Sequence, residues 1–253
     1  MTQDPPDAQA RLQSKPATWL DMALYLVVGI GLFFLVSFGA GFIFAETSIL
    51  ASLTFYLLNF FILCGTVYAL GVRRGKLTWE EMGFLPPRVQ WQWLLVAVIA
   101  SAILIPLRMV LGYIIMFLAE GGLESMQARA DLISAGMGFS WINFALTLLG
   151  AGVLAPISEE LYFRGLLHGW FKSRHFALWP RVLLSSALFG LAHLDSLAVA
   201  ASSFVLGVAN ALLYERSKSI WIPIAMHVLT NSVAVILMYA VLAVMEYFPM
   251  LGM

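Results

Sequence analysis

Seven long apolar runs dominate the sequence and restrict what the chain can fold into. A helix needs about 20 mainly apolar residues to cross a bilayer. Hydrophobic residues make up 61% of the chain and charged residues 11%, whereas a soluble domain is roughly half apolar and a quarter charged. The sequence therefore predicts an all-α fold, a polytopic transmembrane helical bundle of about seven spans. We expect these spans at about residues 18–45, 49–72, 91–119, 141–172, 178–195, 197–214 and 219–248.

The spans are expected to form one domain. The first 17 residues are polar and contain prolines, and they lack the regions of a removable signal peptide. We expect residues 1–17 to be a disordered tail and residues 18–253 to be a single transmembrane domain. The single cysteine, Cys64, excludes a disulfide within the chain and a CxxC metal motif. A net charge of zero gives no indication of a nucleic-acid partner.

Basic residues predict the orientation of the bundle. With seven spans, one side of the membrane receives 11 of the 14 Lys and Arg residues: Arg11, Lys15, Arg73, Arg74, Lys76, Arg88, Lys172, Arg174, Arg181, Arg216 and Lys218. Arg129 falls on the other side, and Arg108 and Arg164 fall within spans. Because cytoplasmic loops carry an excess of Lys and Arg, we expect the N-terminus to be cytoplasmic. We expect the membrane to be a bacterial inner membrane.

The fourth run contains the stretch "PISEELYFRG", which places charges inside a span. Ionisable side chains within spans are costly and usually face an interior or a cavity. Glu160 and Arg164 are four residues apart, so they can pair on one helix face. Glu159 is rotated by about 100° from Glu160, so the two carboxylates need not share a role. Pro156 removes a helix hydrogen bond just upstream, which opens room for water.

Later spans carry polar partners at the same depth. His193 lies one turn after Phe189, and His227 lies one turn before Asn231. A rise of 1.5 Å per residue puts Glu160, His193 and Asn231 each about 18 Å from the basic ends of their spans. The same count puts His227 at about 12 Å. We therefore expect these side chains to meet in one site.

Such a set supports several kinds of chemistry. A carboxylate and an imidazole can deprotonate a water, and His with Asn can donate hydrogen bonds to an oxyanion. Glu159, His193 and His227 could also hold a divalent metal with an open position. The sequence has neither the HExxH signature of zinc proteases nor a GxSxG elbow for a serine nucleophile.

Three ordered motifs carry a resemblance to a known family. "EELYFR" fits EExxxR, "FGLAH" fits FxxxH and "HVLTN" fits HxxxN. Over about residues 150–235 the chain resembles the CPBP family of intramembrane proteases, which includes the CAAX prenyl endopeptidases and bacteriocin-processing enzymes. The resemblance implies an intramembrane endopeptidase that acts on peptide or protein substrates at the membrane, with or without an attached lipid.

The resemblance also implies roles for the site residues. Glu159 would activate water with His193 beside it, and Glu160 would support the site. Arg164 would orient the carboxylates, while His227 and Asn231 would form the oxyanion site. The family is commonly called metalloproteases, but a water activated by Glu and His without metal is also proposed. Participation of a divalent ion such as zinc therefore stays open.

Other readings of the polar residues stay open as well. His168 is expected to be structural, Arg108 to pair with an acidic group or reach the interface, and Asp195 to form a turn. Asn210 is expected to make an interhelical hydrogen bond. Two other functions are compatible with the sequence: a non-proteolytic membrane scaffold or immunity protein, and a proton-coupled carrier.

Overall fold

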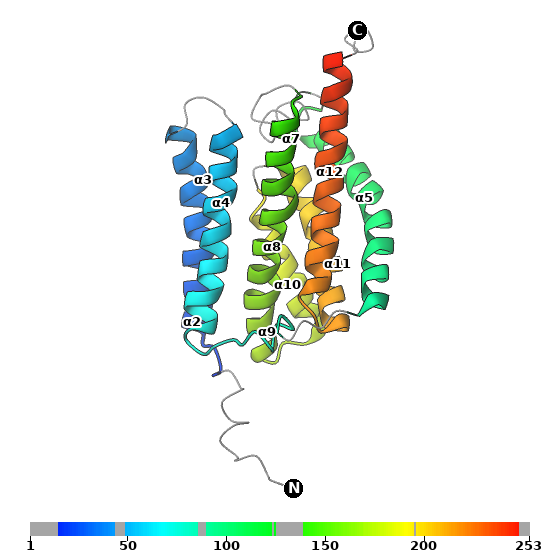
Figure 1. The fold of residues 1–253 in the computed structure, drawn as a ribbon. Coiled ribbons are helices and arrows are strands. Elements are labelled where there is room, and N and C mark those ends of the chain that lie inside the picture. The colour runs from blue at the N-terminus through cyan, green and yellow to red at the C-terminus, as the bar shows by residue number, and fades with distance from the viewer. Residues whose placement is uncertain are drawn as a thin grey trace.

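The computed structural model describes residues 15–43, 49–85, 90–122, 124, 139–194 and 196–247. All regular secondary structure in this part of the chain is helical, and the helices form one bundle (Figure 1). The predicted all-α bundle is therefore confirmed. The elements, with η for a π-helical stretch, are α2 (Trp19–Tyr25), η1 (Leu26–Gly31), α3 (Leu32–Ile43), α4 (Ile49–Thr66), η2 (Val67–Val72), α5 (Trp91–Ala119), α7 (Trp141–Thr147), η3 (Leu148–Leu154), α8 (Ala155–Glu160), η4 (Leu161–His168), α9 (Gly169–Ser173), α10 (Leu178–Leu191), α11 (Leu197–Ser217) and α12 (Trp221–Tyr247).

The predicted spans agree with these helices. Large apolar side chains cover the outside of the bundle: on α5, Leu118 is 76% exposed and Phe117 is 63% exposed. Such an extended apolar surface suits lipid rather than water. The shorter apolar helix Leu178–Leu191 corresponds to the fifth predicted span. Among the described residues, six helical segments are long and apolar enough to cross a membrane: Trp19–Val36, Ala51–Val72, Trp91–Ala119, Trp141–Ser173, Leu197–Ser217 and Trp221–Tyr247.

The segments predicted to share one side of the membrane meet at one end of the bundle. The Lys15 N–H donates to the Gly75 carbonyl over 2.6 Å, and the Ile220 N–H donates to the Met82 carbonyl over 3.2 Å. The turn between α9 and α10 lies at the same end (Figure 1). We call this end of the bundle the basic end. It comprises residues 15–18, 73–85, 174–177 and 218–220. The part of the tail prediction that concerns residues 1–14 lies outside the described residues, as do Arg11, Arg88 and Arg129.

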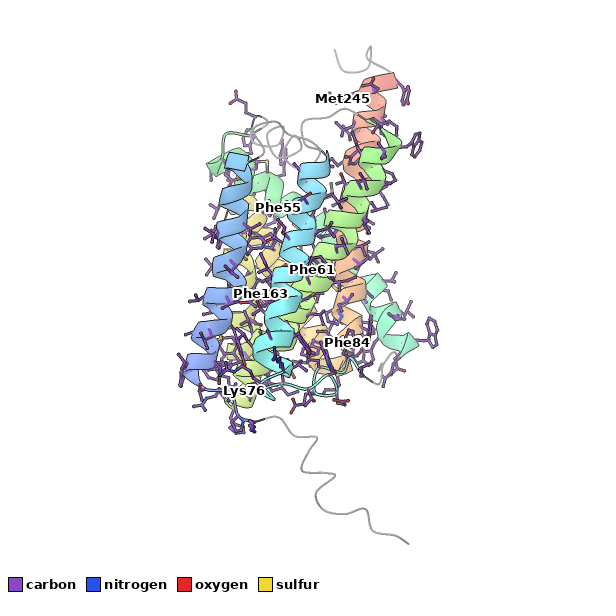
Figure 2. The ribbon with its side chains drawn as sticks, turned by 60° about the vertical axis from the view of Figure 1, so that its left-hand side comes forward. Phe55, Phe61, Lys76, Phe84, Phe163 and Met245 are labelled. Atoms are coloured by element: carbon purple, nitrogen blue, oxygen red, sulfur yellow. The ribbon has the colours of Figure 1, made fainter. Side chains whose placement is uncertain are left out.

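A buried aspartate ties the first span to the basic end. Asp21 accepts hydrogen bonds from the backbone N–H and the hydroxyl of Thr18, which caps α2. Its carboxylate also pairs with Arg74 at 3.0 Å and with Lys76 at 3.2 Å. Lys76 lies at the basic end in Figure 2. Because the Trp170 indole N–H donates to the Thr18 carbonyl over 2.8 Å, α2 is held to α9 as well.

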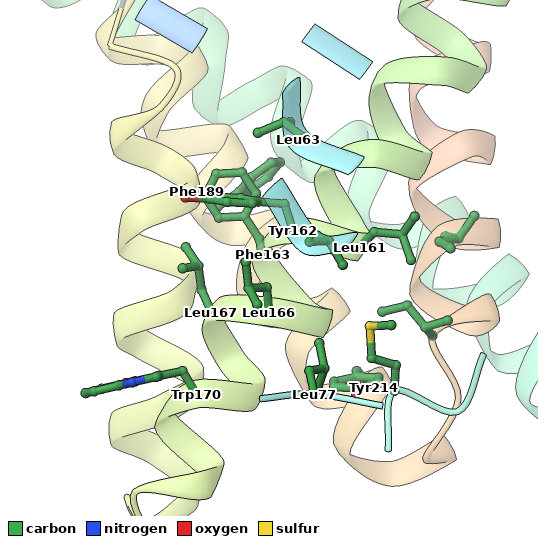
Figure 3. Close-up of a cluster of buried hydrophobic side chains, with 14 of the residues drawn as sticks. Leu63, Leu77, Leu161, Tyr162, Phe163, Leu166, Leu167, Trp170, Phe189 and Tyr214 are labelled. Carbon is green, nitrogen blue, oxygen red and sulfur yellow. The ribbon is translucent and has the colours of Figure 1, made fainter. Parts of the chain in front are cut away.

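The centre of the core is η4, in which every residue is buried. Figure 3 shows its Tyr162 and Phe163 beside Phe189 of α10. The Tyr162 hydroxyl donates to the Tyr25 carbonyl over 2.7 Å. A Cβ at Gly29 would lie 2.3 Å from the Tyr162 ring, so only glycine allows this approach. The first span is therefore packed directly against the span that carries "PISEELYFRG".

Helices α10 and α11 also approach each other closely. A Cβ at Gly190 would lie 2.9 Å from the Ala200 carbonyl oxygen, and a Cβ at Gly207 would lie 3.0 Å from the side chain of Ser186. Small residues therefore set the distance between the two helices. This packing fixes the depth of the polar residues that each helix presents to η4 and α8.

Candidate active site

The site is built around an irregular part of the fourth span, where π-helical η3 and η4 flank α8. Pro156 has no N–H and cannot donate to the Gly152 carbonyl four residues back. Helix α12 supplies donors here: the Ser232 hydroxyl donates to the Gly152 carbonyl over 3.4 Å, and the Asn231 amide donates to the Ala151 carbonyl over 3.2 Å. Side chains of α12 therefore satisfy backbone carbonyls next to the proline.

Glu160 is the polar centre of the site. Its side chain is fully buried, and its Oε1 accepts hydrogen bonds from His227 Nδ1 over 2.7 Å and from Asn210 Nδ2 over 2.9 Å. Arg164 Nη1 lies 3.0 Å from the same oxygen. The predicted Glu160–Arg164 pair is therefore confirmed, and so is an interhelical hydrogen bond from Asn210. Three different elements converge on one carboxylate oxygen.

Phe189 organises the charged and imidazole groups around Glu160. The Arg164 guanidinium carbon lies 4.5 Å from the centroid of its ring. The same ring packs edge-on against His193 and His227, at 4.8 and 5.5 Å between centroids. A buried cation is stable only when it is paired, and here a carboxylate and an aromatic face supply the partners. Phe189 thus couples the charge pair to both histidines.

Glu159 points away from Glu160, as its helix position predicts. Its Oε2 lies 3.6 Å from His227 Nε2, and it faces a small pocket of about 10 Å³. That is about the space that holds one buried water. The pocket is lined by Ile30, Phe33, Leu63, Glu159, Phe163, Ala192 and His193. Glu159 and His193 are its ionisable lining residues.

Hydrogen bonds determine which ring nitrogens can act as bases. His193 Nδ1 lies 2.8 Å from the Phe189 carbonyl. A carbonyl only accepts, so Nδ1 carries the proton and the neutral ring has its lone pair on Nε2. His227 Nδ1 likewise donates to the Glu160 carboxylate, and its Nε2 faces Glu159. Both histidines are therefore held by Nδ1 and present Nε2.

The structure brings most of the predicted site residues together. Glu159, Glu160, Arg164 and His227 are in one polar cluster, and His193 joins Glu159 at the pocket. Asn231 differs, because its amide donates to the Ala151 carbonyl. Sequence reasoning did not place Asn210 in the site. Its depth in the membrane was the available signal.

A bound metal is not matched by this arrangement. Within the described residues, no three His, Cys, Asp or Glu side chains form a group that could hold a metal ion. Glu159, His193 and His227 therefore do not form the three-ligand set that the sequence left open. One nitrogen of His227 is occupied by Glu160, and the other is 3.6 Å from Glu159.

The remaining polar residues of the spans have other partners. His168 Nε2 lies 2.7 Å from Glu215 and its Nδ1 lies 3.1 Å from the Ser185 hydroxyl, which fits the expected structural role. Arg108 Nε donates to the Ser202 carbonyl over 3.0 Å, a backbone partner within the described residues. Asp195 lies outside the described residues.

Residues 140–233 match the family model described as Type II CAAX prenyl endopeptidase Rce1-like. The family resemblance is therefore confirmed over this segment, which contains all the candidate site residues. With its apolar helices, the match identifies an integral, multi-pass membrane protein.

Two curated proteins are similar to parts of the chain. "Putative membrane peptidase YdiL" of Bacillus subtilis (strain 168) is 32% identical over 116 residues, which are 45% of this chain and 43% of that protein. "Uncharacterized 24.3 kDa protein" of Escherichia coli is 35% identical over 85 residues, which are 32% of this chain and 39% of that protein. The chain thus spans less than half the length of either relative. No solved structure matches it significantly.

Proposed function

With residues 140–233 matched to the Rce1-like family, we propose that this protein is an intramembrane endopeptidase that hydrolyses a peptide bond with a water activated by Glu159 and His193. The observation that carries the proposal is the pocket lined by these two residues, which is about the size of one water. It lies within a bundle of apolar helices. A carboxylate and an imidazole Nε2 at one water are the parts that general-base catalysis needs.

The proposed reaction begins with proton transfer from the water to the Glu159 carboxylate. His193 Nε2 accepts a hydrogen bond from the same water and directs it. The resulting hydroxide attacks the carbonyl carbon of the peptide bond and forms a tetrahedral oxyanion. Protonated Glu159 then gives its proton to the leaving amine, and the C–N bond breaks. The products are an amine and a carboxylic acid, which then ionises.

Stabilisation of the oxyanion is assigned to His227 and Asn231. At rest His227 carries its proton on Nδ1; with substrate bound it takes a second proton from solvent on Nε2, and the Glu160 carboxylate on Nδ1 supports the resulting imidazolium. The Asn231 amide can act as a donor if it exchanges the Ala151 carbonyl for the substrate oxygen when the substrate enters. Arg164 offsets the charge of Glu160 and orients it. No step in this scheme passes through a metal.

An apolar groove suggests how the substrate reaches the pocket. The groove, of about 460 Å³, lies between α2 and α10, and all its lining side chains are uncharged. The lining continues toward the small pocket along η1, from Leu26 to Ile30, and past the end of α10, from Leu191 to His193. The groove is lined by Trp19, Met22, Ala23, Leu26, Phe171, Leu184, Ala187, Leu188 and Leu191.

We assign this groove to the apolar part of a membrane-associated, CAAX-type or related substrate, either a hydrophobic peptide end or a lipid attached to it. The groove begins near the basic end, which the positive-inside rule assigns to the cytoplasm of a bacterial cell. The substrate would then enter from the cytoplasmic half of the membrane.

The proposal is tested by comparing membranes that contain the wild-type protein with membranes that contain Glu159→Gln. Mass spectrometry of protein termini should find new termini that depend on Glu159 and that lie in membrane-associated proteins with apolar ends. Identical sets of termini in the two samples would contradict proteolysis and favour a scaffold. Movement of a solute without any cleavage product would favour a carrier.

A further inference from the structure

Asn210 is a buried amide that no sequence motif of the site includes. It lies on α11, its side chain is fully buried, and its Nδ2 donates to Glu160 Oε1 over 2.9 Å. Its Oδ1 has no hydrogen-bond partner among the described residues. A buried amide oxygen without a partner costs free energy, so the hydrogen bond to Glu160 is the compensation that the structure provides. The Asn210 amide is therefore hydrogen-bonded to a carboxylate on another helix.

The position of Asn210 is set by rigid packing. Gly207 lies one turn earlier on the same face and packs against Ser186 of α10. A Cβ added at Gly207 would lie only 3.0 Å from the Ser186 side chain. Helix α11 therefore has little room to slide along α10. Asn210 consequently presents its Nδ2 to Glu160 at a fixed depth.

Glu160 needs such an external support. Of the three groups at its Oε1, Arg164 is an ion-pair partner from the next turn of the same span, and His227 is the group that Glu160 has to orient. Asn210 comes from an independent helix and restrains the direction of the carboxylate. The direction of that oxygen determines whether His227 keeps its proton on Nδ1 and presents Nε2 to Glu159.

We propose that Asn210 is a positioning residue for the reaction: its amide fixes Glu160, and Glu160 in turn fixes the tautomer and orientation of His227. This inference rests on the proposed function. It concerns orientation and not substrate contact, because Asn210 lines neither the small pocket nor the apolar groove. Its loss should therefore lower kcat and leave KM unchanged.

The chain offers a matched control in Asn59. Asn59, another buried asparagine, is 6% exposed and lies in the α4 span, and its Oδ1 likewise has no hydrogen-bond partner within the described part of the chain. Its Nδ2 donates to the Phe55 carbonyl of its own helix. Asn59→Leu removes a buried amide from a span without touching Glu160, so it reports the general cost of such a change.

The first test needs no substrate. The protein contains four histidines. It is labelled with ¹⁵N-histidine, placed in nanodiscs and studied by NMR, and a His227→Gln sample assigns the signal of His227. Wild type and Asn59→Leu should show a single tautomer of His227 protonated at Nδ1. Asn210→Leu should show a mixture of tautomers. An unchanged His227 spectrum in folded Asn210→Leu would overturn the proposal.

The second test uses an internally quenched peptide that ends in a farnesylated Cys-aliphatic-aliphatic-X sequence. Asn210→Leu should lower kcat by about 10- to 100-fold, the range for losing a hydrogen bond to a charged group, with KM unchanged. If wild-type protein does not cleave this peptide, the choice of substrate class fails, while the histidine spectra still decide the role of Asn210. Equal kcat values in Asn210→Leu and Asn59→Leu would overturn that role.

A third variant covers the case in which Asn210→Leu does not fold. Asn210→Asp has nearly the same volume and can donate to Glu160 only when one of the two carboxyls is protonated. Its activity relative to wild type should therefore be highest at low pH and fall as pH rises. A ratio that does not change with pH would indicate a merely structural residue.

Discussion

Glu160 accepts a hydrogen bond from His227 Nδ1 over 2.7 Å, although 67 residues separate them in the chain. The bond joins the fourth span to the last one and determines the tautomer of the histidine. The adjacent carboxylates Glu159 and Glu160 therefore have different surroundings. Glu160 is fully buried and holds the cluster, while Glu159 faces the pocket.

Arg164 is expected to be needed for folding as well as for rate. Arg164→Ala leaves the buried Glu160 carboxylate without its cationic partner, and breaking a buried pair costs about 3–5 kcal/mol. The folded yield in detergent and the midpoint of thermal unfolding should both fall. Arg174→Ala, at an exposed position of the basic end, is the control and should change neither. Normal yield and stability in Arg164→Ala would show that the pair is dispensable.

His227 and Asn231 are expected to act as oxyanion donors. Loss of one such donor lowers the rate by about 10²–10³, so His227→Gln and Asn231→Leu should keep measurable activity. Ser232→Ala, which removes only the donor to the Gly152 carbonyl, serves as the comparison. Single-turnover cleavage normalised to folded protein separates the roles. If Asn231→Leu only lowers stability and cleaves at the wild-type rate, Asn231 merely satisfies Ala151.

Comparison of sequence and structure shows which features local pattern can reveal. Hydropathy predicted the spans, because apolar length decides what can cross a bilayer. Helical spacing predicted the Glu160–Arg164 pair, and membrane depth predicted that His193 and His227 would approach the carboxylates. These inferences depend only on residue spacing and helix rise.

Other features depended on tertiary contacts. Asn210 lies eight residues before Lys218, about 12 Å along its helix, which is the depth inferred for His227. Counting residues along the helix could therefore have placed Asn210 at the depth of the site. It could not have predicted that Asn210 bonds to Glu160. The bond from Asn231 to Ala151 follows from the π-helical stretch next to Pro156. That geometry depends on how α12 packs, and spacing in the sequence does not report it.

The apolar groove is expected to control substrate binding rather than chemistry. Ala187 is a small lining residue on α10, and Ala187→Phe should fill part of the groove. KM for the farnesylated peptide should rise while kcat changes little. Leu183→Phe places the same bulk on an exposed position of the same helix that does not line the groove. Equal KM values in the two variants would remove the groove from substrate binding.

The orientation of the bundle is expected to be N-terminus inside. Single cysteines introduced at Gly75 and Arg174, in a Cys64→Ser background, should react with a membrane-impermeant maleimide only from the cytoplasmic side, because both lie at the basic end. A cysteine at Gly121 should react only from the opposite side. Labelling of Gly75 and Gly121 positions from the same side would contradict the seven-span topology.

The most direct test of the account is single-turnover cleavage by Glu159→Gln, His193→Ala and the double variant, each in liposomes and normalised to folded protein. If the two residues activate one water, each single variant should fall to near background. The double variant should be little worse, because residues of one catalytic unit are not additive. Asn59→Leu should cleave at the wild-type rate. Wild-type turnover in Glu159→Gln would contradict the account and remove Glu159 from the chemistry.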